Sequence, residues 1–541
     1  MHPITRLSIF PRRLRLGVAS FRCFSMGSLP AERRFKADSV CIIGAGPSGL
    51  AAAKYLLAEQ AFSRVTIYEQ RSNVGGIWNY VPLPSDEPPK DLAVPQTNPH
   101  AGKDEPIWQN SNASKILGQP EKEEAAFMTP LYDRLETNIP RGLMGFSDLA
   151  WPEDCQLFPK HEEVLEYIER YAQDVRHLIH FSTQVLDVRL RDDERWSVKT
   201  QAVSRDGRGD KNEDIFDAVI VASGHFNVPY IPKVPGIEEW SRAHPGRITH
   251  SKFYRKPEHY AGKKVIVVGN SASGIDIGAQ IEQGCQHPLL LSSKSESYLS
   301  NDPTETKVDK PPIAEFLTES RSVRFEDGSV EAEVDAILYC TGYFYSFPFL
   351  DSLQPPLITT GERTENTYQH IFYQRHPSLA FPVLNQKVIP FPMAEAQCSV
   401  IARVFSGRLA LPMEAEMKEW ERQVEKDMGD GRIFHVLKFP MDADYINMCH
   451  EWALSADKST SANGKVNGLA NGDHKASSAR IGKEPPFWDE KAYWTRERFP
   501  AIKKAFQSCG EERHSKRSLE DVGFSYEQWK QDKHDECRKL I

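Results

Sequence analysis

The feature that most constrains this chain is a glycine-rich turn that joins a short apolar run to a helix-forming segment. The apolar run, residues 39–43, has the composition of a parallel strand buried on both faces. The turn consists of Gly44, Ala45, Gly46, Pro47, Ser48 and Gly49, and a helix-forming segment continues to Leu57. This Gly-x-Gly-x-x-Gly pattern predicts a dinucleotide-binding unit, because its glycines permit a tight turn, a close approach of pyrophosphate and close packing of helix on strand.

An acidic residue at the expected distance narrows the kind of nucleotide. Glu69 lies twenty residues beyond Gly49, at the end of a predicted strand over residues 65–69. A carboxylate there accepts hydrogen bonds from the ribose hydroxyls and repels a 2′-phosphate. The pyrophosphate would lie at the N-terminus of the helix, where unpaired N–H groups favour an anion. The first unit is therefore predicted to bind FAD or NAD.

Residues 264–281 form a second strand–turn–helix unit of the same kind. Its turn starts at Gly269 and ends at Gly274, with Ser271 in place of the middle glycine. Because two such units lie on one chain, we predict an α/β fold with two Rossmann-like domains.

The residues that follow the next apolar stretch indicate a different nucleotide for the second unit. After residues 289–291 come Ser292, Ser293 and Lys294 rather than an acid. Hydroxyls and an ammonium suit the 2′-phosphate of NADPH by hydrogen bonding and charge. A short solvated basic loop is the alternative interpretation of Lys294.

Two nucleotide sites on one chain imply that a nicotinamide passes electrons to a flavin. The nine cysteines include no Cys-x-x-Cys pair, so a dithiol acceptor is disfavoured and dioxygen remains. The scattered cysteines also fit a reducing compartment better than secretion, and we expect a cytoplasmic protein. No group of histidines and cysteines has the spacing of a metal site.

Charge and composition exclude several classes of partner. The formal net charge of −8 leaves no basic excess to neutralise nucleic-acid phosphates. No apolar run approaches the roughly 18 residues that a membrane-spanning helix needs. With 40% hydrophobic and 26% charged residues, the chain has the composition of a globular protein. The expected partners are small molecules, and a homodimer remains open.

A series of motifs extends from about residue 38 to residue 450. In chain order they are GAGPSGL (44–50), YEQRSNVGGIWNY (68–80), LETNIPRGLMGFSD (135–148), FPKHEEVLEYIERYA (158–172), VASGHFNVPYIPKVPG (221–236), HPGRITHSKFYR (244–255), VVGNSASGIDI (267–277) and YCTGYFYSFPFL (339–350). This series resembles the flavin-containing monooxygenases, and within them the fungal-type, dimethylaniline monooxygenase-like members. The order and spacing of so many motifs make the resemblance specific.

The hallmark of that family is Phe-x-Gly-x-x-x-His-x-x-x-(Phe/Tyr/Trp). Here Gly246, His250 and Tyr254 match it, while His244 replaces the leading aromatic residue. A Trp at the last position would indicate Baeyer–Villiger enzymes, whereas Tyr254 favours N- and S-oxygenation. For His250, we favour a structural role at the hinge of the NADPH domain over proton transfer.

The resemblance implies roles for particular residues. The first turn and Glu69, together with Ile77 and Trp78, would hold FAD. Thr137 and Asn138 match the pair near the flavin ring and the nicotinamide, and Asn138 is the candidate catalytic residue. A neutral amide can donate to one ligand atom and accept from another, although an Asn that closes a turn before proline is the structural alternative. The matches to the NADP-contacting positions are Ser273, Gly274 and Asp276, and the linker that leads back to the FAD domain is matched by Thr341 and Gly342.

The resemblance also implies a reaction. NADPH would reduce FAD before any substrate is needed, dioxygen would then form a peroxyflavin, and bound NADP would protect it. A soft nucleophile, an amine nitrogen or a sulfur of a small molecule, would take one oxygen atom. The protein would supply dryness and orientation rather than a catalytic triad.

Two other functions remain open at this point. One is a Baeyer–Villiger or N-hydroxylating monooxygenase that acts on a ketone or a biosynthetic amine. The other is an NADPH oxidase or a redox-sensing binding protein, which would consume NADPH and release hydrogen peroxide without an oxygenated product. Ser271 in the second turn and the long Pro-rich insertion keep the second alternative open.

The chain is expected to divide into six segments. We predict a basic N-terminal extension over 1–37, the first part of an FAD-binding domain over 38–235 with a Pro-rich insertion over 81–130, an inserted NADPH-binding domain over 236–345, the second part of the FAD domain over 346–454, a disordered linker over 455–482, and a C-terminal tail over 483–541 that packs on the body. Within the first part, a helix is predicted over 162–174, and strands over 185–190, 196–201 and 218–222.

The extension has two interpretations. Its first 31 residues contain no Asp or Glu and five arginines among apolar residues, which is the composition of a mitochondrial presequence. We favour the alternative, a nonfunctional extension with Met26 as a second candidate start.

Overall fold

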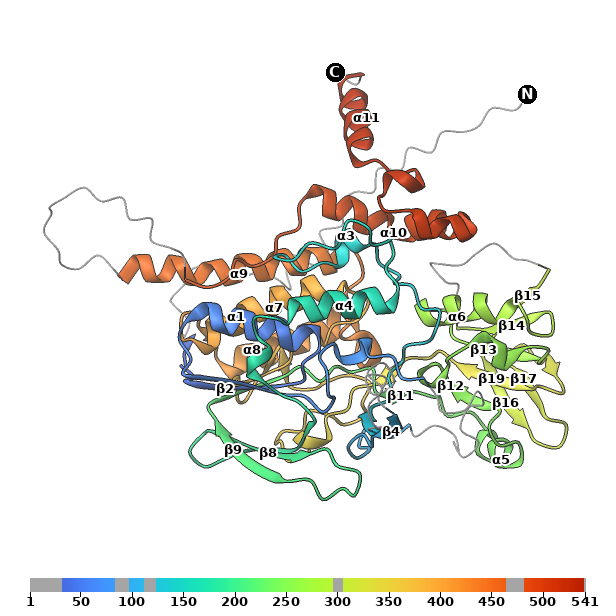
Figure 1. Cartoon of the computed structure of the whole chain (residues 1–541), viewed down its shortest axis with the longest axis horizontal. Helices are drawn as coiled ribbons and strands as arrows, with labels where there is room; N and C mark the ends of the chain where they lie inside the picture. The colour runs from blue at the N-terminus through green and yellow to red at the C-terminus, as the bar shows by residue number, and fades with distance from the viewer. Residues whose placement is uncertain (1–31, 83–96, 111–122, 295–304, 464–480, 540–541) are drawn as a thin grey trace, which may run out of the picture.

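The structure is a computed structural model that describes residues 32–82, 97–110, 123–294, 305–463 and 481–539 (Figure 1). Most of the predicted N-terminal extension, much of the Pro-rich insertion and most of the predicted linker therefore lie outside the described residues.

A seven-stranded sheet carries the first glycine turn. In sheet order its strands are β21 (Thr367–Tyr368), β22 (Phe372–Tyr373), β23 (Leu379–Ala380), β10 (Ala218–Val221), β2 (Ser39–Ile43), β3 (Arg64–Tyr68) and β6 (Ile179–His180). The run from β23 to β6 is parallel, and β21 and β22 are antiparallel additions at one edge. Residues 40–43 and all of β10 are buried, as the apolar runs predict.

A five-stranded parallel sheet carries the second turn. Its order is β12 (Ile248–His250), β19 (Ala336–Tyr339), β13 (Val265–Val268), β14 (Leu289–Ser292) and β15 (Lys307–Lys310). All of these strands come from the chain between β10 and β21, so one Rossmann-like domain is inserted into the other. The two crossing segments, β11 (Val228–Pro229) and β20 (Tyr343–Phe344), pair antiparallel and form a two-stranded connection.

Helices cover the first sheet and complete both turns. The helix α1 (Pro47–Glu59) follows the first turn, and α6 (Ala272–Glu282) follows the second. The long α7 (Pro390–Phe405) is buried from Phe391 to Phe405 and packs between α1 and α9 (Met441–Asn463). The predicted helix over 162–174 is α4 (His161–Tyr171), and its apolar face is buried, with Val164, Tyr167, Ile168 and Tyr171. The other α-helices among the described residues are α3 (Arg141–Met144), α5 (Ile237–Ala243), α8 (Glu414–Met428), α10 (Glu490–Ser508) and α11 (Tyr526–Lys539).

Antiparallel strands fill the remaining regions. Two of the three strands predicted between the turns form a meander with a further strand: β7 (Thr183–Leu190), β8 (Trp196–Ala202) and β9 (Lys211–Phe216). A smaller meander consists of β16 (Ile313–Leu317), β17 (Ser322–Phe325) and β18 (Val330–Glu331). Near the start of the described chain, β1 (Glu32–Arg33) pairs with β24 (Leu411–Pro412).

The described parts of the Pro-rich insertion include an antiparallel pair of strands, β4 (Ile107–Asn110) and β5 (Glu123–Ala126). One sequence expectation needs correction. The linker was expected to begin at residue 455, but α9 continues to Asn463. Ala453 and Ala456 are buried, so packing continues the helix into a segment whose composition alone indicates disorder.

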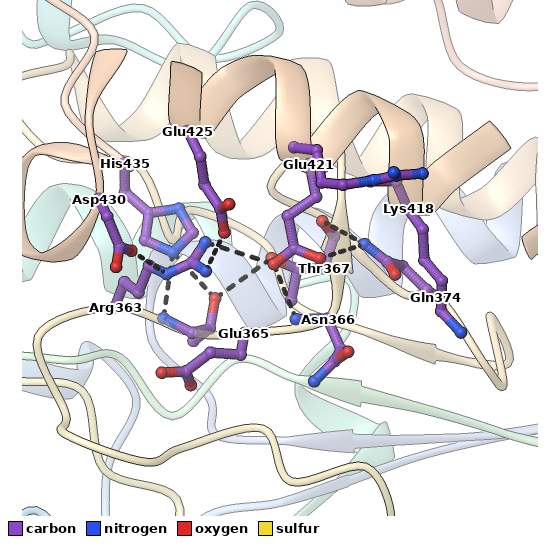
Figure 2. A network of polar contacts seen from close by, with 12 residues as sticks. Arg363, Glu365, Asn366, Thr367, Gln374, Lys418, Glu421, Glu425, Asp430 and His435 are labelled. Carbon is purple, nitrogen blue, oxygen red and sulfur yellow. Dashed lines mark hydrogen bonds and ion pairs between the residues drawn. The ribbon is translucent and has the colours of Figure 1, made fainter. Parts of the chain in front are cut away.

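A partly buried ion-pair network joins α8 to the edge of the first sheet (Figure 2). The guanidinium of Arg363 lies 3.3 Å from Glu421 and 2.8 Å from Asp430, and it also pairs with Glu425. Glu421 accepts a further hydrogen bond of 2.7 Å from the amide of Gln374. Such shared partners satisfy charges that burial would otherwise penalise.

The C-terminal segment lies against the body of the protein. The hydroxyl of Tyr55 on α1 donates to the carbonyl of Glu484, and Lys483 pairs with the buried Glu395 of α7. Figure 1 shows α10 beside α3, and the two helices are in contact. Among the described residues, no helix has both the length and the apolar character required to cross a bilayer.

Candidate active site

The first glycine turn has the conformation that the sequence predicts. Gly44 has a φ of +102°, and a Cβ on it would lie 2.6 Å from the carbonyl oxygen of Ala222. A Cβ on Gly49 would lie 1.9 Å from the carbonyl oxygen of Gly44, so α1 can begin this close only with glycine. A Cβ on Gly46, in contrast, would meet no protein atom closer than 3.5 Å. The missing side chain of Gly46 therefore leaves room above the turn, as a pyrophosphate requires.

The second turn repeats this geometry. Gly269 has a φ of +106°, and a Cβ on it would lie 2.6 Å from the carbonyl oxygen of Cys340. A Cβ on Gly274 would lie 1.9 Å from the carbonyl oxygen of Gly269. Ser271 has a φ of −85°, close to the −77° of Gly46. Because any L-residue adopts that conformation, the serine fits the turn without backbone strain.

Glu69 lies directly beside the first turn. Its side chain is buried, and it accepts hydrogen bonds of 2.8 Å from the N–H of Ala45 and 2.9 Å from the N–H of Arg71. It follows β3, the neighbour of β2 in the sheet. The carboxylate is thus fixed at the carboxyl ends of the parallel strands, where a ribose would lie.

The glycine pair before Trp78 packs against the first turn. A Cβ on Gly76 would lie 3.1 Å from the Cα of Gly46. The amide of Asn79 donates to the carbonyl of Gly76 at 3.1 Å and holds this short 3₁₀ segment in place. Ile77 and Trp78 are thereby presented next to the space above Gly46.

Both turns open into one cavity of about 2060 Å³. This volume exceeds the roughly 300–1,000 Å³ of a typical small-molecule site, so it has room for two dinucleotides and a substrate. The predicted site residues that line it are Gly44, Gly46, Pro47, Ser48, Glu69, Ile77, Trp78, Thr137, Asn138, Ser273, Lys294, Thr341 and Gly342. The predicted residues that do not line it are Ala45, Gly49, Gly274 and Asp276. Of these four residues, Ala45, Gly49 and Gly274 lie within the two glycine turns.

Asn138 contributes an amide to the cavity wall. The preceding Thr137 is buried, and its hydroxyl donates to the carbonyl of Ile139 at 2.9 Å, which fixes the backbone around Asn138. Asn138 itself is only partly buried. Within the described part of the chain, its side chain has no hydrogen-bond partner. The geometry therefore leaves both its donor and its acceptor available to a ligand.

Asp276 does not line the cavity. Its carboxyl accepts hydrogen bonds from the hydroxyl of Tyr132 and, at 3.1 Å, from the amide of Gln280. Burial raises its pKa, an effect that Lys503 and Tyr132 oppose. The contact with Tyr132 joins α6 to the segment that leads to Thr137. Asp276 therefore connects the two domains.

His250 supports the return linker. It is fully buried, its Nδ1 accepts a hydrogen bond of 3.1 Å from the N–H of Lys252, and its Nε2 lies 3.0 Å from the carbonyl oxygen of Gly342. Since Nδ1 accepts, Nε2 carries the proton and donates. Burial lowers its pKa to about 3, so the ring is neutral near pH 7. This geometry agrees with the structural role favoured for His250.

Several residues that line or support the site were not among the predicted site residues. The buried Arg255 donates hydrogen bonds to the carbonyls of Val81, Leu131 and Thr129, and thereby holds the segment that leads to the site. The guanidinium of Arg432 donates to the carbonyl of Thr341 at 3.1 Å. From α10, the side chains that line the cavity are Arg496, Glu497, Phe499 and Pro500. The tail was predicted to pack on the body, but no sequence pattern predicted that it would reach the cavity.

Comparison with known proteins decides the family. The family model described as "Flavin-binding monooxygenase-like" matches residues 117–307 and 306–459. This chain belongs to that family. A model of an NAD(P)-binding Rossmann-like domain also matches, over residues 42–96.

Relatives in this family cover most of the chain. Flavin-containing monooxygenase FMO GS-OX3 of Arabidopsis thaliana is 32% identical over 406 residues, which are 72% of this chain and 78% of the relative. FMO GS-OX5 of the same plant is 33% identical over 404 residues, with the same coverage. The S-allyl-L-cysteine S-oxygenase from Allium sativum is 29% identical, with a TM-score of 0.61 over 86% of this chain and 99% of that one. Tmm from Pelagibacter sp. strain HTCC7211, at 21% identity and a TM-score of 0.60, shares the fold.

These matches confirm the resemblance, the fold and the cofactors. The chain is a flavoprotein monooxygenase with two Rossmann-like domains, and it binds FAD and NADPH. The residues present fit both groups, because each turn leaves open space at the N-terminus of a long helix and Glu69 is placed for a ribose without a 2′-phosphate.

Proposed function

We propose that this protein uses FAD and NADPH to transfer one atom of dioxygen to an amine nitrogen or a sulfur of a small molecule. The observation that carries the proposal is the single cavity into which both glycine turns and Asn138 open. Such an arrangement lets one nucleotide reduce the other and leaves space beside them for a substrate.

Particular residues would hold each group. The first turn, Glu69, Ile77 and Trp78 would hold FAD in the domain formed by residues 38–235 and 346–454. In the domain of residues 236–345, NADPH would be held by Ser273 at the start of α6, by Lys294 and by the Thr341–Gly342 linker. Lys294 is exposed and lines the cavity, as a contact to a 2′-phosphate requires.

When reduced by NADPH, the bound flavin supplies the two electrons with which dioxygen gives one atom to the substrate and one to water. The chain's own task is then to orient and to exclude water. The amide of Asn138 can donate to an oxygen and accept from a nicotinamide amide without acquiring a charge. His225 also lines the cavity, and burial lowers its pKa to about 4, so it is a neutral ring at pH 7. Asn138 and His225 would thus orient bound groups through neutral hydrogen-bonding side chains.

Part of the wall is apolar and suits the body of a small nucleophile. Ile139 follows Asn138, and Phe391 packs on Phe146 with ring centroids 4.8 Å apart. Phe439 and Phe499 flank the guanidinium of Arg496 at 5.9 and 4.8 Å. Except for Phe146, all of these side chains line the cavity. A thioether or a tertiary amine would bury its carbon groups here.

The proposal is tested by product analysis with purified flavin-loaded enzyme. A thioether, a tertiary amine and a cyclic ketone are each supplied with NADPH and air, and product, NADPH consumption and hydrogen peroxide are measured. We expect a sulfoxide or an N-oxide in near-stoichiometric ratio to NADPH. A lactone from the ketone alone would indicate Baeyer–Villiger chemistry, and peroxide without product would indicate an oxidase. Either result would overturn the proposal.

The Asn138→Ala variant should keep FAD but lose coupling. Because the amide faces the cavity and holds no other side chain, its removal should leave the fold intact and cost about one hydrogen bond to the reacting groups. That loss corresponds to about a tenfold fall in product per NADPH oxidised. The measurement is the ratio of product to peroxide, with Asn212→Ala, an exposed position on β9, as the control. An unchanged ratio would refute the assigned role.

A further inference from the structure

The helix α10 lies beyond the region that the family model matches, which ends at residue 459. The carboxylate of Asp489 caps its N-terminus by accepting from the N–H of Ala492 at 2.9 Å. Its middle turns bring Arg496, Glu497, Phe499 and Pro500 to the cavity. The tail is therefore part of the cavity wall.

A buried ion pair fixes this part of α10. The Nε of Arg496 lies 2.7 Å from the carboxylate of Asp442 on α9, and neither side chain is more than 8% exposed. The same guanidinium donates to the carbonyl of Lys387 at 3.1 Å. Lys387 itself lines the cavity. The helix is thus held against two other segments of the wall by contacts that solvent does not screen.

Two turns further along, Lys503 reaches the segment that carries Asn138. Its ammonium donates a hydrogen bond of 2.8 Å to the carbonyl of Thr137, and the side chain is 7% exposed. The Nζ atom lies 4.6 Å from the ring centroid of Phe158 and 5.4 Å from that of Phe506. An aromatic and aliphatic cluster therefore shields this hydrogen bond from water.

Charges from both domains face Lys503. Asp276 on α6 and Glu136, which precedes Thr137, both favour its charged form, while burial and Arg513 oppose it. Glu136 is itself paired with Arg513 at 3.3 Å. Lys503 thus lies where the tail, the Thr137 segment and the helix of the second nucleotide turn meet.

We propose that α10 forms one wall of the oxygenation site and that Lys503 is a positioning residue, which holds the Thr137 carbonyl and thereby orients Asn138. The catalytic part of this inference rests on the proposed function. Removing the ammonium would leave a buried carbonyl without its donor, and the segment would relax toward other partners. Displacements of about 1 Å in positioning groups cost up to about 100-fold in rate.

The test compares Lys503→Met with Lys504→Met. Methionine keeps an apolar stem of similar length but has no donor, and Lys504 is an exposed neighbour on the same helix, so both variants lose one positive charge. The first measurement is hydrogen–deuterium exchange of the peptide that contains Thr137 and Asn138, in flavin-loaded protein without NADPH. We expect at least a tenfold faster exchange in K503M and wild-type exchange in K504M.

The second measurement is the ratio of product to hydrogen peroxide at saturating NADPH. We expect about a tenfold fall in K503M, no change in K504M, and partial recovery in Lys503→Arg, which retains a donor. If the wild-type enzyme forms no product, the proposed function is refuted. The exchange measurement then tests by itself whether Lys503 holds the Thr137 segment. Coupled wild-type enzyme with an equally coupled K503M would overturn the present inference.

A purely structural role would give a different pattern. It predicts a lower melting temperature in K503M with unchanged exchange and coupling below the transition, and that result would also overturn the proposal. If K503M does not fold, Lys503→Gln replaces it in both measurements.

The role of α10 as a wall of the cavity is tested separately with Phe499→Ala. This variant should raise the KM of an apolar thioether about tenfold with little change in the KM of NADPH. An unchanged thioether KM would contradict the role of α10 as a wall.

Discussion

Gly274→Ala should give a yellow protein that NADPH no longer reduces. A Cβ at this position would lie 1.9 Å from the carbonyl oxygen of Gly269, which is backbone and does not move aside as a flexible side chain would. The start of α6 must then shift away from β13 and misplace the turn that would hold the NADPH pyrophosphate. We expect the rate of flavin reduction by NADPH to fall on the order of 100-fold or more, since small displacements of binding groups have effects of that size.

The measurement is anaerobic mixing of flavin-loaded protein with NADPH, followed by the loss of flavin absorbance. Dithionite should still reduce the variant, because the first domain is untouched. The matched control is Gly278→Ala, one turn further along α6, where a Cβ would meet only the side chains of Leu291 and Leu289 at ordinary contact distance. Gly49→Ala should instead yield colourless protein, because a Cβ there would lie 1.9 Å from the carbonyl oxygen of Gly44 in the first turn. Normal reduction of Gly274→Ala would show that the second turn does not hold the reductant.

Acidification from pH 7.5 to pH 5.5 should destabilise the protein by several kcal/mol. Four histidines with no more than 6% of their surface exposed have lowered pKa values because burial penalises the charged ring. The pKa falls to about 4 for His225 and to about 3 for both His250 and His370, and that of His435 lies well below its usual range. The unfolded chain then binds more protons than the folded one below about pH 6.5.

The sign follows from this difference. Stability is fully present above the unfolded pKa of about 6.5 and falls as the pH decreases toward the folded values. At pH 5.5 each histidine accounts for about 1.4 kcal/mol. Buried carboxyls such as Glu421 and Asp442 have raised pKa values and act in the opposite sense. The range above pH 5.5 is chosen because ordinary carboxyls titrate below it.

Hydrogen bonding shows independently that two of these rings are neutral. The Nε2 of His435 accepts from the N–H of Thr364 at 3.2 Å, so its proton is on Nδ1, which lies 2.9 Å from the Nδ1 of His370. A second proton on the His435 ring, at Nε2, would break the contact with Thr364. A proton on Nδ1 of His370 would break the contact between the two rings. Urea unfolding of the flavin-loaded protein at several pH values measures the effect, and a midpoint that stays constant between pH 7.5 and pH 5.5 would contradict it.

The sequence by itself determined the two nucleotide units and much of their surroundings. A Cβ would meet backbone atoms at four glycines of the two turns, Gly44, Gly49, Gly269 and Gly274. These backbone atoms belong to the turn itself or to the end of the neighbouring strand, so the requirement for glycine appears in the sequence as a fixed spacing. The inward face of α4 and the buried strands were predictable for the same reason, because their periodicity reflects burial on one face or on both. The order of the motifs then specified the family.

Only the tertiary structure decided which residues share the cavity. It turned Asp276 toward Tyr132, it continued α9 beyond residue 455, and it brought Lys503 to the carbonyl of Thr137, 366 residues away in the sequence. No spacing or periodicity encodes such contacts. From the sequence alone, a lysine is expected at the surface, because burial of its charge is costly. The fold places a carbonyl, aromatic rings and carboxylates around Lys503, and these groups compensate its desolvation.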